Sequence, residues 1–156
     1  MTNDLPFTGE RFLPSVGGNI FLEHMHRYAL AARLVSGKDV LDVASGEGFG
    51  SKILSQHARS VIGVDIAEDA VAHAQSKYGS NTLSFRAGSV THIPLEDASV
   101  DVVVSFETIE HIAEHEEMLA EVKRVLRQGG VLIISTPDKT TYSDATNYVN
   151  PYHIRE

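Results

Sequence analysis

The segment that decides the fold reads Asp42-Val43-Ala44-Ser45-Gly46-Glu47-Gly48-Phe49-Gly50. It follows a short apolar run at 40–43 and opens a helical pattern at 48–57, so it predicts a glycine-rich turn between a strand and a helix. Glycine suits such a turn because it adopts backbone conformations that a Cβ would obstruct, and because a ligand can approach it closely. In doubly wound sheets ligands bind at this end of the strand. For the glycines alone, an ordinary tight turn is the other interpretation.

Downstream of the turn, short apolar runs alternate with helical patterns. Strands are expected at 61–64, 83–86, 100–106 and 131–135, and helices at 68–78 and through Leu119, Val122 and Leu126 as far as Gly129-Gly130. The runs at 102–104 and 131–134 are apolar on successive residues, which is typical of parallel strands buried on both faces. This alternation predicts an α/β fold with a Rossmann-like, doubly wound and mainly parallel sheet.

Upstream of the turn, a helical pattern covers 19–34. Its apolar residues recur at helical spacing and are Phe21, Met25, Tyr28 and Ala32. Gly37 follows as the expected stop. We therefore expect residues 1–36 to form an N-terminal cap segment with a helix, and residues 37–156 to form the Rossmann-like domain that binds the ligand.

Composition excludes several classes of function. The 156 residues, 42% of them hydrophobic, suit one globular domain. Thirteen Lys and Arg against 21 Asp and Glu give a net charge of -8, which repels phosphate backbones, so no nucleic-acid partner is expected. The absence of Cys removes thiol chemistry and fits a cytoplasmic location. No apolar run approaches the ~20 residues that a membrane-spanning helix needs, so no membrane span is expected.

Three further features at matched spacing predict a nucleoside pocket. Asp42 stands four residues before Gly46, and Asp65 ends the second strand nineteen residues after Gly46. An acid at the end of that strand can accept hydrogen bonds from both ribose hydroxyls. The segment Gly88-Ser89-Val90 follows the third strand, where a loop edge can meet an adenine ring.

Residues 38–137 resemble the class I S-adenosylmethionine-dependent methyltransferases, and in particular their type 11-like bacterial group. The motifs that carry the resemblance are Asp42-x-x-x-Gly46-x-Gly48-x-Gly50, Val64-Asp65-Ile66, Phe106-Glu107-Thr108-Ile109-Glu110-His111-Ile112 and Leu126-Arg127-Gln128-Gly129-Gly130-Val131-Leu132, in the family's order. The resemblance implies strand order 3-2-1-4-5 and S-adenosylmethionine as cofactor, with S-adenosylhomocysteine as product. Relatives continue into two more strands, which this chain is expected to lack, so its sheet edge predicts a possible homo-oligomer.

The resemblance also implies a set of cofactor-binding residues. They are Tyr28, Asp42, Ala44, Ser45, Gly46, Gly48, Asp65, Ile66, Gly88, Ser89, Val90 and Phe106. Asp65 would hold the ribose and Ile66 the adenine. Many relatives have Asp in place of Ser89, so the adenine contact is expected to be made differently here. Tyr28 would cover the sulfonium or the acceptor, or else pack in the core.

Two residues are candidates for catalysis. A hydroxyl acceptor must lose its proton, and His111 is the first candidate for the base, with Glu107 second. Capping a helix or packing against the cofactor is the alternative role of His111. The string His111-Ile112-Ala113-Glu114-His115 also matches the inverted zinc-protease motif, but it lies inside a methyltransferase motif, so no metal site is expected.

The predicted function is methyl transfer to a small-molecule or glycan-type acceptor. The stretches 8–12, 22–28 and 148–153 look like a bacterial subgroup often linked with polysaccharide or lipopolysaccharide assembly. Two alternatives stay open: a non-catalytic or incomplete S-adenosylmethionine-binding module, and a nicotinamide-dependent dehydrogenase. The dehydrogenase fingerprint is G-x-G-x-x-G, and the glycine spacing of this chain differs from it.

Overall fold

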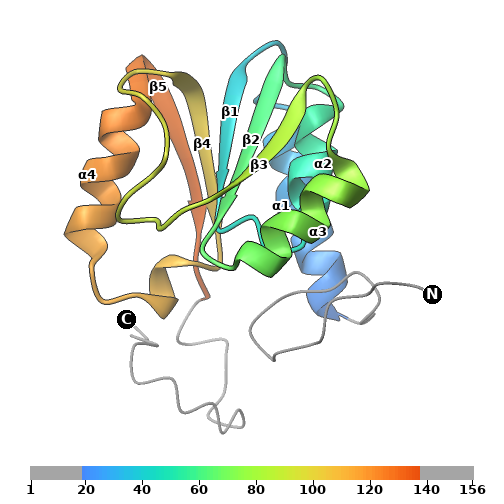
Figure 1. Cartoon of the computed structure of the whole chain (residues 1–156), viewed down its shortest axis with the longest axis horizontal. Helices are drawn as coiled ribbons and strands as arrows, with labels where there is room; N and C mark the ends of the chain where they lie inside the picture. Colours follow the sequence, from blue (N-terminus) through green and yellow to red (C-terminus); the bar gives the residue numbers. More distant parts are fainter. Residues whose placement is uncertain (1–18, 138–156) are drawn as a thin grey trace, which may run out of the picture.

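Five parallel strands form the central sheet of the computed structural model, which describes residues 19–137 (Figure 1). The strands are β1 Asp39–Val43, β2 Ser60–Asp65, β3 Leu83–Ala87, β4 Val100–Phe106 and β5 Leu126–Ser135. Their order is β3-β2-β1-β4-β5, with every neighbouring pair parallel, which confirms the predicted topology. The strand order reverses between β1 and β4, and a doubly wound sheet binds its ligands at such a point.

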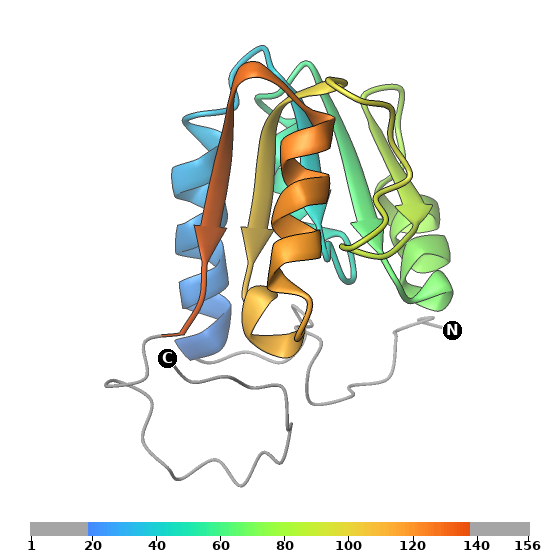
Figure 2. The ribbon, with the colours of Figure 1, turned by 90° about the vertical axis from the view of Figure 1, so that its left-hand side faces the viewer.

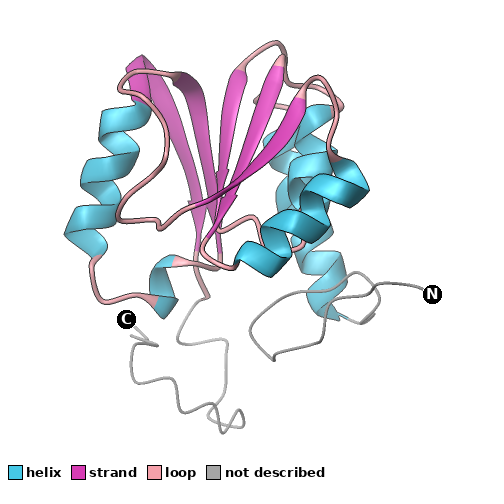
Figure 3. Cartoon of the chain, in the orientation of Figure 1, coloured by secondary structure: helices cyan, strands magenta, loops and turns pink. Residues whose placement is uncertain are grey.

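Helices cover both faces of the sheet (Figures 1 and 3). Their bounds are α1 Asn19–Ala32, α2 Phe49–Ser55, α3 Glu68–Tyr78 and α4 His115–Val125, with a short 3₁₀ helix at Ile109–His111. Figure 1 shows α1, α2 and α3 on one face and α4 on the other. The arrowheads of the strands point to one end of the molecule, so the loops that follow β1, β2 and β4 meet there (Figure 2).

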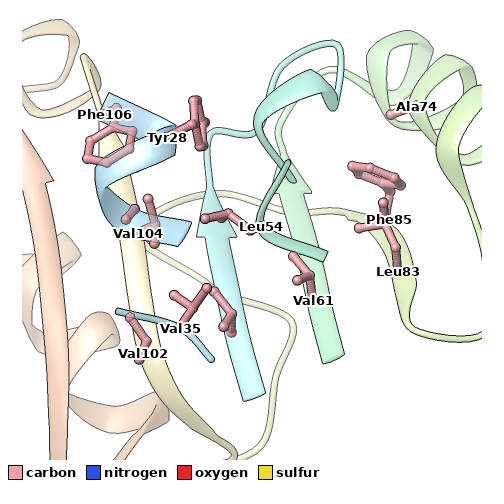
Figure 4. Packing of buried hydrophobic residues seen from close by; sticks show 12 residues of the cluster. Tyr28, Val35, Leu54, Val61, Ala74, Leu83, Phe85, Val102, Val104 and Phe106 are labelled. Carbon is pink, nitrogen blue, oxygen red and sulfur yellow. The ribbon is translucent and has the colours of Figure 1, made fainter. Parts of the chain in front are cut away.

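The core consists of two apolar clusters, one on each face of the sheet. The cluster under α1, α2 and α3 includes Tyr28, Val35, Leu54, Val61, Ala74, Leu83, Phe85, Val102, Val104 and Phe106 (Figure 4). On the other face, Val103 packs with Met118 and Val122 of α4. Successive residues of β4 therefore point into opposite clusters, which confirms that the run 102–104 is buried on both faces.

The predicted boundary between the last helix and the last strand is wrong. The helix ends at Val125, because Leu126 has extended backbone angles (φ -71°, ψ 133°) and pairs with Val100 of β4. Leu119 is 44% exposed and lies off the buried face, which Met118 and Val122 form instead. Pairing with β4 therefore takes the residues before the glycine pair into β5.

The predicted burial of the run 131–134 is also wrong. Within residues 19–137, β5 is an edge strand with β4 as its partner. Val131 is 52% exposed and Ile134 is 40% exposed, whereas Leu132 and Ile133 pack against the two clusters. An edge strand has a neighbouring strand on one side only, whereas a central strand has one on each side. The apolar residues of β5 therefore stay partly exposed to water. Self-association through this edge stays a prediction.

The helix before the turn is shorter than its pattern predicts. It ends at Ala32, and Gly37 lies in the loop that follows, with φ +67°. Tyr28 and Ala31 pack in the same cluster as residues of the sheet. The predicted division of the chain at residues 36 and 37 stays a prediction, and the stretches 8–12 and 148–153 lie outside the described residues. Within the described part of the chain, the helices lack the length and apolar character needed to cross a membrane.

Gly50 lets helix α2 lie close to α1. A Cβ on Gly50 would overlap the ring of Tyr28, which α1 holds against the sheet. Alanine normally stabilises a helix by about 1 kcal/mol relative to glycine. We nevertheless expect Gly50→Ala to lower the free energy of unfolding by about 1–3 kcal/mol, because the overlap forces the two helices apart. Urea denaturation measures the difference, and a Gly50→Ala protein more stable than wild type would contradict this packing.

Candidate functional site

A cavity of about 480 Å³ opens at the carboxyl ends of the strands. Its walls come from the glycine turn after β1, the end of β2, the loop after β3, the loop after β4 and one side of α1. The predicted site residues that line it are Tyr28, Ala44, Ser45, Gly46, Gly48, Asp65, Ile66, Gly88, Ser89, Val90, Phe106, Glu107 and His111. Asp42 is the predicted residue that does not line it.

The glycine turn has left-handed backbone at three positions. Gly46 has φ +55° and Gly48 has φ +90°, and the non-glycine residue Ala44 has φ +57°. Such angles strain a residue with a Cβ, and strain of this kind gathers at functional sites. The turn also packs closely on its surroundings, since a Cβ on Gly48 would lie 2.7 Å from the Cβ of Ala74. The geometry therefore requires glycine at position 48.

Asp65 ends β2 and faces the turn with a fixed carboxylate. Its Oδ2 accepts a hydrogen bond from the Gly46 N–H (2.8 Å), and its Oδ1 accepts one from the Ala67 N–H (2.9 Å). A carboxylate oxygen accepts more than one hydrogen bond, so both oxygens keep capacity for a ligand. Beside Asp65, Ile66 is 77% exposed and lines the cavity. A carboxylate that can accept hydrogen bonds from two neighbouring hydroxyls thus lies next to the apolar surface of Ile66.

Asp42 lies beneath the turn with no exposed surface. It accepts hydrogen bonds from the hydroxyls of Ser51 (2.6 Å) and Tyr28 (3.2 Å). Burial raises the pKa of Asp42 to about 7, although both hydroxyl hydrogen bonds act in the opposite direction. Asp42 therefore joins α1 and α2 to the end of β1 and supports the turn from below.

Tyr28 belongs both to the core and to the cavity wall. Its ring meets the ring of Phe106 edge-on, with the centroids 5.0 Å apart (Figure 4). Burial and the Asp42 carboxylate raise the pKa of Tyr28 well above its ordinary value, so the hydroxyl stays protonated and donates to Asp42. The two roles expected for Tyr28, cover of the ligand and packing, are compatible in this position.

The loop after β4 is fastened to neighbouring elements by carboxylates. Glu107 has φ +51°, and its Oε1 accepts a hydrogen bond from the Ser135 hydroxyl (2.9 Å) and pairs with Arg27 of α1 (3.4 Å). Farther along the loop, Glu110 accepts a hydrogen bond from the hydroxyl of Thr136, which follows β5 (3.1 Å). These contacts fix the short helix that presents His111 to the cavity.

His24 of α1 also lines the cavity and is not among the predicted site residues. His24 and Tyr28 stand four residues apart, on one face of the helix, whereas His26 points elsewhere and is exposed. Burial and the neighbouring Arg27 lower the pKa of His24. The remaining lining residues are neighbours of predicted ones: Glu47, Phe49, Gly50, Ala67, Thr108 and Ile112.

The zinc-protease string does not form the geometry that its spacing suggests. His111 ends the 3₁₀ helix, Ile112 is extended (φ -124°, ψ 154°), and His115 begins α4. The two histidines are therefore not one turn apart on one helix, and His115 Nε2 lies 2.9 Å from the carbonyl oxygen of Ile109. In the range 19–137, no group of three or more His, Asp or Glu side chains is arranged to hold a metal ion.

Comparison with known proteins places the chain in a family. A family model described as a methyltransferase domain matches residues 41–134. A protein of Mycolicibacterium smegmatis named "Probable S-adenosylmethionine-dependent methyltransferase" is 41% identical over 97% of this chain and 60% of its own length. A ubiquinone biosynthesis O-methyltransferase of Rhizobium rhizogenes is 28% identical over 76% of this chain and 48% of its own length. The chain thus spans about half to three fifths of these relatives.

The solved structures agree with the sequence matches. A S-adenosylmethionine-dependent methyltransferase from Aquifex aeolicus superposes with a TM-score of 0.73 at 25% identity, over 91% of this chain and 81% of that chain. The matched segment contains the turn, Asp65 and the loop after β4, so the comparisons and the cavity concern the same residues. They favour the methyl donor over the nicotinamide alternative. The chain belongs to the class I S-adenosylmethionine-dependent methyltransferases.

Proposed function

We propose that this protein transfers a methyl group from S-adenosylmethionine to a hydroxyl of a small-molecule or glycan-type acceptor. The observation that carries the proposal is the Asp65 carboxylate, held by two backbone N–H groups beside the exposed Ile66 in a cavity at the strand ends. This pair offers a nucleoside an acceptor for its ribose hydroxyls and an apolar surface for its base.

The other residues of the cavity fit the same cofactor. A glycine turn with left-handed backbone lets a ligand approach the main chain next to Asp65. Strand β3 lies next to β2, and the loop after it brings Ser89 and Val90 to the cavity. The Ser89 hydroxyl lies 2.8 Å from that of Thr91 and accepts a hydrogen bond from the Thr91 N–H (3.2 Å), so the loop has a defined conformation.

S-adenosylmethionine supplies a methyl group that its sulfonium already activates. The protein's own residues then have to orient an acceptor, exclude water and receive a proton. Tyr28 and Phe106 form an aromatic wall of the cavity, which excludes water from that side. Positioning two reactants in this way can supply several of the ~7–11 kcal/mol available from proximity.

His111 is the residue that we propose as the base. It lines the cavity with its side chain 31% exposed, and an imidazole nitrogen can accept the proton of an acceptor hydroxyl. Glu107 is the second candidate, but its Oε1 is engaged by Ser135 and Arg27. This engagement gives Glu107 the role of holding the loop in place.

A hydroxyl acceptor agrees with one of the relatives, which is named an O-methyltransferase of ubiquinone biosynthesis. Release of S-adenosylhomocysteine, measured with a panel of hydroxylated small molecules and soluble glycans, tests the proposal. We expect turnover with members of this panel. Cofactor binding without turnover on any acceptor would instead favour the alternative of a non-catalytic binding module.

Replacement of His111 separates catalysis from binding. We expect His111→Ala to lower kcat by about 100-fold or more with the cofactor Kd unchanged, because a general base contributes about 10²–10⁴ in rate. The exposed His57 provides the matched control, and His57→Ala should turn over like wild type. A His111→Ala enzyme that binds cofactor normally and keeps full turnover would end the proposal for this residue.

A further inference from the structure

Glu47 is a buried carboxylate inside the glycine turn, and the proposed methyl transfer assigns it no role. The residue is only 4% exposed, although the turn itself borders the cavity. Glu47 is one of the residues that line the cavity, and the hydrogen-bond partners of its carboxylate lie on α3. Burial of a charge is costly unless the charge is paired, so the partners of Glu47 decide whether this position is tolerable.

Helix α3 supplies three partners to this one side chain. The Lys77 Nζ donates to Glu47 Oε1 at 2.5 Å, His73 Nε2 lies 3.2 Å from the same oxygen, and the Tyr78 hydroxyl lies 3.2 Å from both oxygens. The Lys77 ammonium also stands 5.1 Å from the centre of the Tyr78 ring. Three side chains from the second half of α3 thus surround the Glu47 carboxylate.

The turn transmits this contact to Asp65. Glu47 directly follows Gly46, whose N–H donates to Asp65 Oδ2. The flanking glycines both have left-handed backbone, so the turn needs external contacts to keep one conformation. A shift of residue 47 would move the Gly46 N–H and release one of the two donors that orient the Asp65 carboxylate.

We propose that Glu47 is a positioning residue: by binding α3, it holds the glycine turn in the conformation that orients Asp65 toward the cofactor. The inference rests on the proposed cofactor site and assigns Glu47, Lys77 and Tyr78 a part in cofactor affinity that acts through the conformation of the turn. An amide oxygen at the same place can accept from Lys77 and Tyr78, so Glu47→Gln keeps these hydrogen bonds and removes the charge.

Calorimetric titration with S-adenosylhomocysteine tests the proposal on folded variants. We expect Glu47→Ala to raise Kd at least tenfold and Glu47→Gln to stay within about threefold of wild type, since about 1.4 kcal/mol corresponds to a factor of ten. The control is Glu121→Ala on α4, which also removes a carboxylate that binds a cation (Arg124) and a backbone N–H (Ile93). Its Kd should equal that of wild type.

The outcomes separate this inference from the proposed function. Wild-type protein that does not bind the nucleoside would overturn both. Wild-type binding with an unchanged Kd for folded Glu47→Ala, or an equal rise in Glu121→Ala, would overturn the inference alone. Should Glu47→Ala not fold, Lys77→Met decides, because the Lys77 side chain is 44% exposed and the Glu47 carboxylate keeps His73 and Tyr78 as partners. An increase of threefold or more in Kd supports the proposal, and an unchanged Kd overturns it.

Discussion

Replacing Asp65 with alanine is expected to raise the Kd for S-adenosylhomocysteine by about 100-fold or more. The carboxylate would accept hydrogen bonds from two ribose hydroxyls, and a hydrogen bond to a charged group contributes about 1.5–3 kcal/mol. The substitution also leaves the Gly46 N–H without this acceptor, which loosens the glycine turn. Calorimetric titration of wild type and Asp65→Ala measures the difference.

The control for this substitution lies at the opposite end of the sheet. Asp101 accepts hydrogen bonds from the Asp39 N–H and from Arg127, away from the cavity. Asp101→Ala therefore removes an aspartate with a backbone and a cationic partner, and its Kd should stay at the wild-type value. An Asp65→Ala protein that binds the nucleoside as tightly as Asp101→Ala does would show that Asp65 does not hold the ribose.

Stability should depend on pH through Asp42. Burial raises its pKa from 3.8 to about 7 in the folded protein, so the folded state keeps a proton that the unfolded chain has lost. The free energy of unfolding attributable to Asp42 is therefore greatest below about pH 4 and falls as the pH rises to about 7. At about 1.4 kcal/mol per pH unit, the loss between about pH 5 and about pH 8 is about 3 kcal/mol.

Asp42→Asn isolates this effect. An amide oxygen can still accept from Ser51 and Tyr28, but the side chain no longer titrates. Urea denaturation at a series of pH values should show the wild type losing about 3 kcal/mol relative to Asp42→Asn between about pH 5 and about pH 8. All other titrating groups are common to both proteins and cancel. Parallel curves for the two proteins would show that Asp42 is ionised throughout.

The sequence is sufficient to predict the α/β fold from its local patterns, and the motifs that carry the family resemblance predict the sheet order and most of the cavity. Each strand end carries its own signal: the glycine turn after β1, Asp65 at the end of β2 and the Glu-His-Ile string after β4. Parallel strands bring their carboxyl ends to one edge, so residues predicted separately meet in space. The same patterns place His111 on the cavity.

The features that could not be predicted depend on partners distant in sequence. The apolar spacing of Val122 and Leu126 predicts that the helix continues to Leu126. In the structure Leu126 pairs with Val100 of β4 and belongs to strand β5 instead. The run 131–134 has the composition of a central strand, which carries no information on whether a neighbour covers it. Glu47 finds its partners 26 to 31 residues away on α3, where no local spacing relates them.

A crystal structure of the protein with S-adenosylhomocysteine tests the central claim most directly. We expect both ribose hydroxyls within hydrogen-bond distance of the Asp65 carboxylate, with the adenine against Ile66 and the sulfur facing the wall formed by Tyr28 and Phe106. A nucleoside bound outside this cavity, or bound in it with its ribose away from Asp65, would contradict the assignment of the site.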